Sequence, residues 1–548
     1  MNISRAVGRR TLMFFALLAI APLWVSAAVN RPVLKWQYGG CYSSWCETGW
    51  YSSPAVADLD GDGKTEVIAS AYSIAVLKGE NGALVWRVPS GHDRRTPGAD
   101  NVGRTWPGIV VTDVDGDSKL EIVSAHGGGY VSVYDHSGYF QGGWPRRPVS
   151  NELRGLNVAD IDADGTDEIV VTGAVYGKTN TWVYEHNGAL RSGWPQLSNT
   201  TGYAYGVFND NSWVADINQD GHKEIIVPSD VHYICGYTDD GRQLPTNSIY
   251  DGKGWGKIGL WESYAIEQRG WGDCSSTRAE RYRTNLAHGA AVAADVDGNG
   301  TIEVIATGNM YDCAQGHPPG IYTPLFIFNS DRSRFNISSW DWQEPAKNTG
   351  APLSEDYSRI ENCQPNPVVV DLDGDGTKEI LFSSYDGRIH CFWLDKTEHH
   401  SWPYNVYKAS EGFYRFSSEP VVADLDRDGK AEIIFSSWVE KTSSGGVRLG
   451  KLHILDYRGR LLHEVVLPRP KSASVHWNGA LAAPTIANID SDGDYELILN
   501  TVASGFVAYD LPGSSSARIL WRTGRNKQYD EFFGPRPLVP VLHLLLED

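Results

Sequence analysis

The chain has 548 residues, of which 41% are hydrophobic and 21% are charged, and its formal net charge is −19. This composition can supply a large hydrophobic core and is not that of a disordered protein. The acidic balance argues against nucleic acid as a partner, because a phosphate backbone binds basic surfaces.

The first segment has the features of a secretory signal peptide. Arg5, Arg9 and Arg10 precede an apolar stretch at 12–25, and small residues at 25–27 resemble a cleavage site. We therefore expect residues 1–27 to be removed and the mature protein to be secreted, either to the periplasm or outside the cell. The stretch is short for a membrane span, and retention as an anchor is the weaker alternative. We expect a monomer with no integral membrane span.

An acidic motif then recurs along the chain. Its first copy, DLDGDGKTE from Asp58 to Glu66, places oxygen-bearing side chains at positions 1, 3, 5 and 9. Seven further copies follow at intervals of 47 to 79 residues, each between short runs rich in β-branched residues. Two more strands follow in several copies. Four antiparallel strands per repeat form one blade of a β-propeller, so the fold class is all-β. Eight copies predict eight blades, and seven blades with a leftover unit are the alternative.

The segment 33–39 resembles the expected fourth strands at 83–89 and 517–524. We expect it to pair with the last blade and so to close the ring. The propeller would then occupy residues 28–525, and residues 526–548 would form a C-terminal tail of unassigned role.

The crowding of carboxylates in each loop calls for a cation. Two such charges 4 Å apart repel each other by about 4 kcal/mol at an effective dielectric constant near 20. Hard oxygen donors suit Ca²⁺, and the loop differs from an EF-hand because its glutamate comes at position 9 and strands flank it. The alternative is that these segments are acidic surface turns without an ion. This alternative is the weaker of the two, because eight copies share the same ligand spacing. We expect up to eight calcium ions with a mainly structural role.

The expected calcium ligands are the side chains at positions 1, 3, 5 and 9 of every copy. Asparagine replaces aspartate in three copies, which predicts weaker sites there. The full set is Asp58, Asp60, Asp62, Glu66, Asp113, Asp115, Asp117, Glu121, Asp160, Asp162, Asp164, Glu168, Asp216, Asn218, Asp220, Glu224, Asp295, Asp297, Asn299, Glu303, Asp371, Asp373, Asp375, Glu379, Asp424, Asp426, Asp428, Glu432, Asn488, Asp490, Asp492 and Glu496.

The DxDGDGxxE loop between two short strands resembles the FG-GAP/VCBS repeat, the unit of the integrin α-chain N-terminal propeller. The resemblance covers roughly residues 33–525. It implies a calcium-binding β-propeller with ligands at the first, third, fifth and ninth loop residues. Propellers of this superfamily include adhesion and lectin-like modules and also rhamnogalacturonan lyases, whose extra N-terminal region is not recognisable here.

Two long intervals, between Asp216 and Asp295 and between Asp295 and Asp371, offer room for a functional site. The first mixes aromatic, arginine and carboxylate side chains, a combination that suits sugar recognition. Such an insertion can equally well only cap the ring. The residues singled out there are Trp255, Trp261, Glu262, Tyr264, Arg269, Trp271, Arg278 and Glu280, and an earlier segment adds His92, Arg94, Arg95, Arg104 and Trp106.

Two functions compete on this evidence. The favoured one is a binding or adhesion module for polysaccharide or for cell-surface glycan or protein. The alternative is a polysaccharide-active enzyme, most plausibly a lyase on uronate polymers, which needs a positive group and a proton acceptor. Arg281, Tyr282, Arg283 and His288 are the catalytic candidates for that alternative.

Seven cysteines in an exported chain suggest disulfides with one thiol left over. Cys41 and Cys46 are close enough in sequence to close a small loop, and Cys274 could pair with Cys313. No cysteine or histidine spacing is that of a zinc or redox site.

Overall fold

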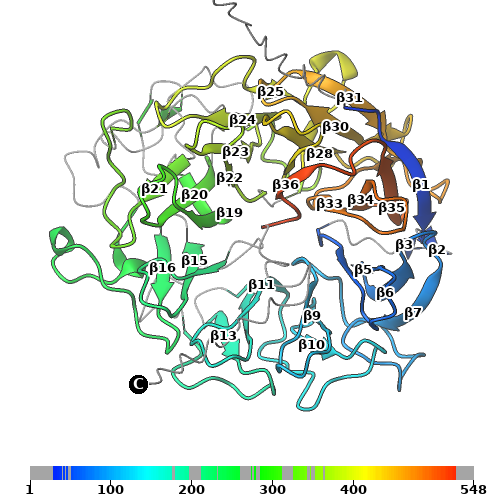
Figure 1. Ribbon diagram of the computed structural model, residues 1–548, viewed down its shortest axis with the longest axis horizontal. Coiled ribbons are helices and arrows are strands. Elements are labelled where there is room, and N and C mark those ends of the chain that lie inside the picture. The colour runs from blue at the N-terminus through cyan, green and yellow to red at the C-terminus, as the bar shows by residue number, and fades with distance from the viewer. Residues whose placement is uncertain are drawn as a thin grey trace, which may run out of the picture.

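Small antiparallel sheets follow one another around a ring (Figure 1). The computed structural model describes residues 29–39, 41–42, 45–46, 51–175, 179–196, 212–230, 233–259, 273–274, 277–278, 284–310, 325–341, 346, 352–361 and 365–525. Within these ranges the regular structure is almost entirely β-strand, and the helices are single turns of 3-10 helix at Ser248–Tyr250, Trp255–Lys257 and Ala409–Glu411. No helix among them is long and apolar enough to cross a membrane.

Every copy of the acidic motif joins the first and second strands of a separate sheet, and the glutamate at position 9 of the motif opens the second strand or lies within it. The first three strands of these units are β4 (Ala55–Ala57), β5 (Glu66–Ser70) and β6 (Ser73–Lys78); β8 (Val110–Thr112), β9 (Glu121–Ala125) and β10 (Val131–Tyr134); β11 (Leu153–Ala159), β12 (Glu168–Gly173) and β13 (Thr181–Tyr184); β14 (Trp213–Ala215), β15 (Glu224–Asp230) and β16 (Tyr233–Tyr237); β19 (Thr284–Ala294), β20 (Glu303–Met310) and β21 (Leu325–Phe328); β22 (Val368–Val370), β23 (Glu379–Ser383) and β24 (Arg388–Phe392); β27 (Val421–Asp424), β28 (Glu432–Val439) and β30 (Lys451–Leu455); and β33 (Thr485–Ala487), β34 (Tyr495–Asn500) and β35 (Phe506–Leu511).

A fourth strand completes several of these sheets. These strands are β7 (Leu84–Pro89), β25 (Tyr404–Asn405), β31 (Leu461–Val466) and β1 (Val33–Tyr38). In other units single bridges such as Tyr134 to Phe140 and Tyr184 to Leu190 hold the corresponding segment beside the third strand. The short pairs β2 (Cys41–Tyr42) with β3 (Trp45–Cys46), β17 (Asp273–Cys274) with β18 (Thr277–Arg278), and β29 (Arg448–Leu449) with β32 (Trp477–Asn478) lie outside these units, and β26 (Arg415–Ser417) extends β28.

The second strands form the core because side chains on both of their faces are buried. All five residues of β5 and all eight of β28 are buried, as expected for β-branched and aromatic runs between neighbouring sheets. Each core cluster joins adjacent units, and one of them packs Val56 and Val67 against Ile489 and Ile498. Neighbouring sheets are therefore held together by apolar contacts, as in a propeller.

The ring is closed by its first strand, as the sequence predicted. β1 pairs antiparallel with β35 and becomes the outer strand of the last sheet. Trp36 Nε1 donates a hydrogen bond to the carbonyl of Gly79 in the first unit at 2.7 Å. The N-terminal segment thus joins the last unit to the first.

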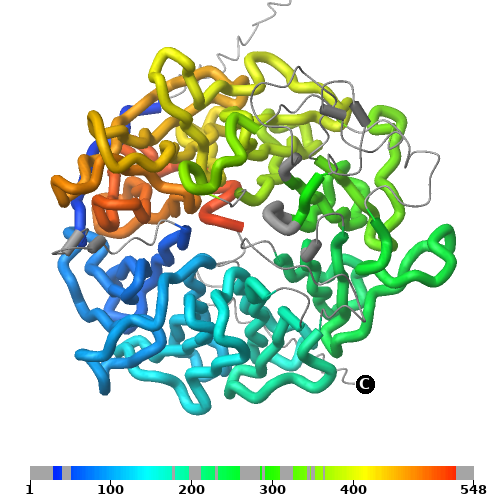
Figure 2. The backbone as a smooth tube through the Cα atoms, turned by 180° about the vertical axis from the view of Figure 1, so that it is seen from behind, coloured from blue at the N-terminus to red at the C-terminus, as the bar shows by residue number. Residues whose placement is uncertain are grey.

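The segment 517–524 was expected to be a fourth strand, and this prediction is wrong. β36 (Arg518–Trp521) pairs instead with β27, the first strand of the preceding unit. It lies near the centre of the ring in both views (Figures 1 and 2). The reason is that β1 already occupies the outer edge of the last sheet, so the chain continues to the free inner edge of β27.

The cysteine predictions receive partial answers. Cys41 and Cys46 stand opposite each other in the β2–β3 pair. Cys235 and Cys391 are buried, and Cys391 is a free thiol. The proposed partner of Cys274, Cys313, lies outside the described residues.

Candidate metal centres and a central pocket

The acidic loops share one backbone shape. In the first loop the N–H of Gly63 donates to Asp58 Oδ2 at 2.9 Å, the N–H of Asp62 to Asp60 Oδ1 at 3.2 Å, and the N–H of Lys64 to Asp62 Oδ1 at 2.8 Å. The bond from position 6 to the aspartate at position 1 recurs in the first seven loops. These bonds fold each loop back on itself and bring its carboxylates together.

Position 4 of the first seven loops and position 6 of all eight have a left-handed backbone, which favours glycine at these positions. Gly61 and Gly63 have φ of 73° and 82°. Ser118 occupies position 6 of the second loop with φ of 70°, so that loop keeps its shape without the glycine.

The glutamate at position 9 is buried in every loop and points one oxygen inward. Its Oε2 accepts the N–H of position 2 in all eight loops, for example from Leu59 to Glu66 at 3.1 Å and from Leu372 to Glu379 at 2.7 Å. The strand that begins at this residue therefore holds the glutamate against the loop.

Several loop oxygens are buried without a hydrogen-bond donor. They include Oε1 of Glu168 and Glu379 and Oδ1 of Asp58 and Asp424. A buried acceptor without a donor costs about 1–3 kcal/mol, and more when it is charged. A cation within the loop would satisfy these oxygens, so the donor set fits Ca²⁺.

The electrostatics of the loops also favour a bound cation. Burial, together with repulsion from Asp373, Asp375 and Asp371, raises the pKa of Glu379 to about 8, although the hydrogen bond from the N–H of Leu372 lowers it. The same causes raise the pKa of Glu66 to about 7 and that of Glu432 to about 8. A bound ion would keep these carboxylates ionised at neutral pH.

The structure brings three of the four predicted ligands together in at least five of the loops. Carboxylate oxygens within 4.8 Å of one another are found in loops one, two, three, five and six, among Asp58, Asp60 and Asp62; Asp113, Asp115 and Glu121; Asp160, Asp162 and Glu168; Asp295, Asp297 and Glu303; and Asp371, Asp373 and Glu379. Side-chain cations lie near predicted ligands in four of the loops. Lys119 Nζ lies 2.6 Å from Asp117 Oδ2 in the second loop, and Arg518 Nε lies 4.0 Å from Asp424 Oδ2 in the seventh. Arg191 Nη2 lies 2.8 Å from Asp162 Oδ2 in the third loop, and Lys35 Nζ lies 3.0 Å from Glu496 Oε1 in the eighth.

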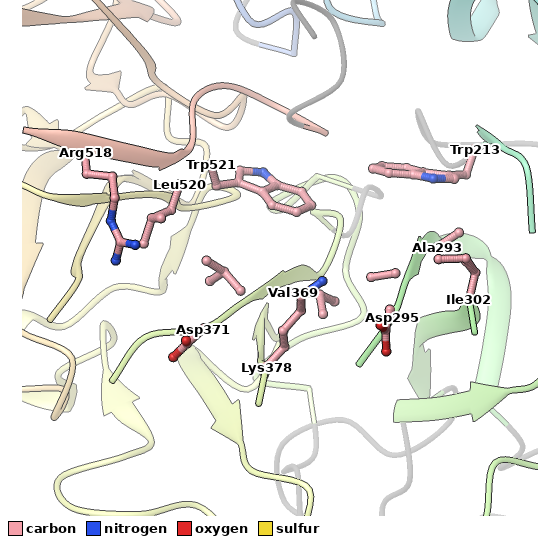
Figure 3. Close-up of a pocket in the computed structure, with 12 residues that line it drawn as sticks. Trp213, Ala293, Asp295, Ile302, Val369, Asp371, Lys378, Arg518, Leu520 and Trp521 are labelled. Carbon is pink, nitrogen blue, oxygen red and sulfur yellow. The ribbon is translucent and has the colours of Figure 1, made fainter. Parts of the chain in front are cut away.

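A pocket lies near the centre of the ring, beside the fifth and sixth loops (Figure 3). It has a volume of about 460 Å³, and residues of β14, β19, β22 and β36 line it. The indoles of Trp213 and Trp521 stand on one side, with ring centroids 6.4 Å apart and planes 23° apart. Lys378 and Arg518 add positive charge to the lining.

The same pocket includes Asp295 and Asp371, the first ligand positions of the two loops. Their charge opposes an anionic ligand unless calcium offsets it. Sequence reasoning missed this pocket, because the segment that contains Trp521 was expected to be a fourth strand at the outer edge of a sheet. Only the return of β36 to the centre brings the two indoles together.

Most of the catalytic candidates cannot be placed. Arg281, Tyr282 and Arg283 lie outside the described residues, and His288 lies in β19 but its side chain is not described. Most of the aromatic and charged residues of that insertion also lie outside the described residues, namely Trp261, Glu262, Tyr264, Arg269, Trp271 and Glu280. Arg278 lies in β18, but its side chain is not described. Trp255 is fully buried, and the guanidinium of Arg332 lies 5.9 Å from its ring centroid.

The earlier arginine-rich segment forms a packed cluster. The ring centroids of Trp106 and Tyr51 are 3.8 Å apart, and the guanidinium of Arg154 lies 3.6 Å from the Trp106 ring. Tyr51 Oη donates to Glu361 at 2.6 Å, and Arg104 lies over both rings. These groups satisfy one another, so the cluster acts mainly in packing.

Arg94 and Arg95 lie over the ring of Tyr139, at 5.7 and 5.1 Å from its centroid. Arg95 also pairs with Asp93 at 2.5 Å. The remaining member of this segment, His92, is half-buried. No common site therefore forms among the described side chains of His92, Arg94 and Arg95.

Comparison with known proteins identifies the repeat. The profile of the FG-GAP-like repeat matches residues 113–171, 160–227 and 371–435. These matches cover five of the acidic loops, and the last match extends into β28. No curated protein matches the chain.

Solved structures with a similar fold have low sequence identity to the chain. Sqt1 of Saccharomyces cerevisiae is 9% identical with a TM-score of 0.50, and the match covers 88% of this chain and all of that one. The exotype rhamnogalacturonan lyase YesX is 17% identical with a TM-score of 0.49, covering 88% and 75% of the two chains. The biofilm matrix protein Bap1 of V. cholerae is 15% identical with a TM-score of 0.38, covering 90% and 94%. At this level the likeness concerns the fold and says nothing of ligand or activity.

Proposed function

We propose that this FG-GAP repeat protein is an exported, calcium-stabilised β-propeller that binds acidic polysaccharide. Eight sheets, each carrying one acidic loop, support a ring of eight blades. The buried loop oxygens without a hydrogen-bond donor support calcium at the loops. The basic start and apolar stretch of the N-terminus support export.

The observation that carries the binding function is the central pocket. Indole faces stack on the CH faces of sugar rings, and Trp213 and Trp521 offer two indoles at one side of the cavity. Arg518 and Lys378 can form charge-assisted hydrogen bonds with a carboxylate. A uronate residue combines these two chemical features, so uronate polymers are the ligand class we propose.

Calcium would also control the charge of this pocket. Without the ion, Asp295 and Asp371 place negative charge beside the two basic residues. With calcium in the fifth and sixth loops that charge is offset, and an anionic sugar can approach. We therefore expect binding of uronate polymers to require calcium as well as the basic residues.

The test is retention on immobilised polygalacturonate, alginate and neutral dextran, with calcium or with EDTA. Arg518→Gln with Lys378→Gln should weaken binding to a uronate polymer by about tenfold or more, since a hydrogen bond to a charged group contributes about 1.5–3 kcal/mol. Lys223→Gln is the matched control, because Lys223 holds position 8 of the fourth loop as Lys378 does in the sixth, yet is not among the lining residues.

Unchanged retention of the double variant would reject the pocket as the binding site. Equal retention on dextran would reject acidic sugars as its ligands. The same samples report on the alternative activity, because a lyase would produce absorbance at the unsaturated-uronate band.

A further inference from the structure

Lys35 occupies an irregular position in the strand that closes the ring. In the β1–β35 pair Leu34 stands opposite Tyr509 and Trp36 opposite Ala508, so Lys35 is an extra residue without a partner. Such a bulge redirects the side chain of the inserted residue. The side chain of Lys35 is only 16% exposed, so it lies inward rather than in solvent.

The ammonium of Lys35 lies among the carboxylates of the eighth loop. It contacts Asp490, lies 3.0 Å from Glu496 Oε1 and lies 3.6 Å from Asp492 Oδ2. These three residues are the acidic members of the ligand set that the motif defines for this loop. One ammonium therefore contacts all of the carboxylates that a calcium ion would use there.

The eighth loop also lacks the bond that shapes the other seven. Asn488 stands at position 1, and its Oδ1 accepts the N–H of Asp490 at 3.2 Å. In the other loops the aspartate at position 1 accepts the N–H of position 6, as Asp371 does from Gly376. The first ligand position of this loop is thus neutral and differently bonded.

Other units show what the same bulge does without a lysine. In the first unit Leu77 stands opposite Leu84 and Val76 opposite Trp86, which leaves Val85 as the extra residue. In the seventh unit Leu462 is the extra residue of the corresponding bulge. Both side chains are apolar and at least 40% exposed, so neither supplies a charge to its loop.

Two further units show intermediate cases. Gln141 follows the bridged residue Phe140, and its Nε2 donates to Glu121 Oε1 at 3.0 Å. Arg191 follows Leu190 and contacts Asp162 in the third loop, but it also pairs with Glu185 and Asp239. Of the residues Gln141, Arg191 and Lys35, only Lys35 is a cation whose ion pairs all lie within one loop.

We propose that Lys35 is a built-in cation that replaces calcium in the eighth loop, and that the residue at this bulge decides whether a loop takes the ion. The inference rests on the proposed calcium function of the other loops. Its consequence is that the last sheet is neutralised by the strand that closes the ring, without an ion from solution. The eighth loop would then be a latent calcium site, opened by removal of one side chain.

The experiment exchanges the two bulge residues and counts bound calcium. Calcium per chain is measured by equilibrium dialysis with elemental analysis for the wild-type protein, Lys35→Val, Lys35→Met and Val85→Lys. Both Lys35 variants should bind one more ion than the wild type, and Val85→Lys should bind one fewer. The methionine variant keeps the length of the side chain, in case valine weakens the closure.

The outcomes separate this inference from the proposed function. If the wild type binds no calcium, the calcium function fails. If the wild type binds several ions and both folded Lys35 variants bind the same number, the eighth loop is not held by Lys35 and the inference fails. A loss of ions in the Lys35 variants would also overturn it, because the lysine would then support calcium instead of replacing it.

Discussion

Replacing Glu379 by glutamine should lower the stability of the protein in the presence of calcium but not in its absence. Glu379 is fully buried, one oxygen accepts the N–H of Leu372 at 2.7 Å, and the other has no hydrogen-bond partner. Glutamine keeps a carbonyl for Leu372 and removes the charged oxygen that faces the loop. The variant should therefore fold but lose one bound ion.

The size of the effect follows from linkage. An ion present at 100 times its dissociation constant stabilises the folded state by about 2.7 kcal/mol. Extracellular calcium modules bind with constants of about 10⁻⁴ M, so about 10 mM calcium meets that condition. Unfolding of roughly 500 residues has an entropy of about 1 kcal/mol per kelvin, so the loss of one site lowers the melting temperature by about 2–3 °C.

The assay is calorimetric melting of the wild type and Glu379→Gln, with calcium and with EDTA. In calcium the melting temperature of the variant should be about 2–3 °C lower than that of the wild type. In EDTA it should be at least as stable as the wild type, because burial and the neighbouring aspartates raise the pKa of Glu379 to about 8 and make its charge unfavourable. Exposed Glu80→Gln is the control. An equal response of the variant and the wild type to calcium would refute the argument.

EDTA should lower the melting temperature of the wild type by roughly 15–20 °C if seven such sites are lost together; an unchanged melt would exclude structural calcium. Asp60→Ala should remove about one bound ion per chain, measured by elemental analysis, and unaltered stoichiometry would mean that the first loop is not a site. Burial lowers the pKa of His390, but the effect of Asp386 and Glu398 is larger, and together these causes raise the pKa to about 9. The stability that this histidine contributes is therefore present below pH 6.5 and lost as the pH rises through 9. His390→Gln should remove that part of the pH dependence of the free energy of unfolding, measured in urea. An identical pH profile for the variant and the wild type would contradict this prediction. Trp36→Ala should cost about 3–5 kcal/mol, measured by the same unfolding, since it removes a buried indole and the hydrogen bond to the first unit; a loss below 1 kcal/mol would mean that the closure is held elsewhere.

The repeated loops and their flanking strands could be predicted because their signals are local. The spacing from Asp58 to Glu66 fixes the loop, and the apolar runs beside it fix two strands. The closing strand was also predictable, because the sequence around Trp36 matches that around Trp86. In each case a few adjacent residues determine the structure.

The remainder depends on contacts that local sequence does not encode. The segment around Trp521 has the pattern of an outer strand, yet it pairs with β27 because β1 holds the outer edge of the last sheet. Trp213 and Trp521 meet only in the closed ring. Lys35 reaches the eighth loop because it lies at a β-bulge, and residue spacing in the sequence does not predict a bulge.

The pairing of the first strand with the last sheet sets an order on folding. The bond between Lys35 and Glu496 joins residues 461 positions apart, and closing a loop of that length costs about 5 kcal/mol of chain entropy. During synthesis β1 emerges early and must wait for β35, with its backbone donors and acceptors unpaired. A waiting edge strand is a template for wrong pairing with other chains. A chain cut short before residue 485 would keep that edge open permanently, so truncation at the C-terminal side should lead to aggregation rather than to a smaller ring.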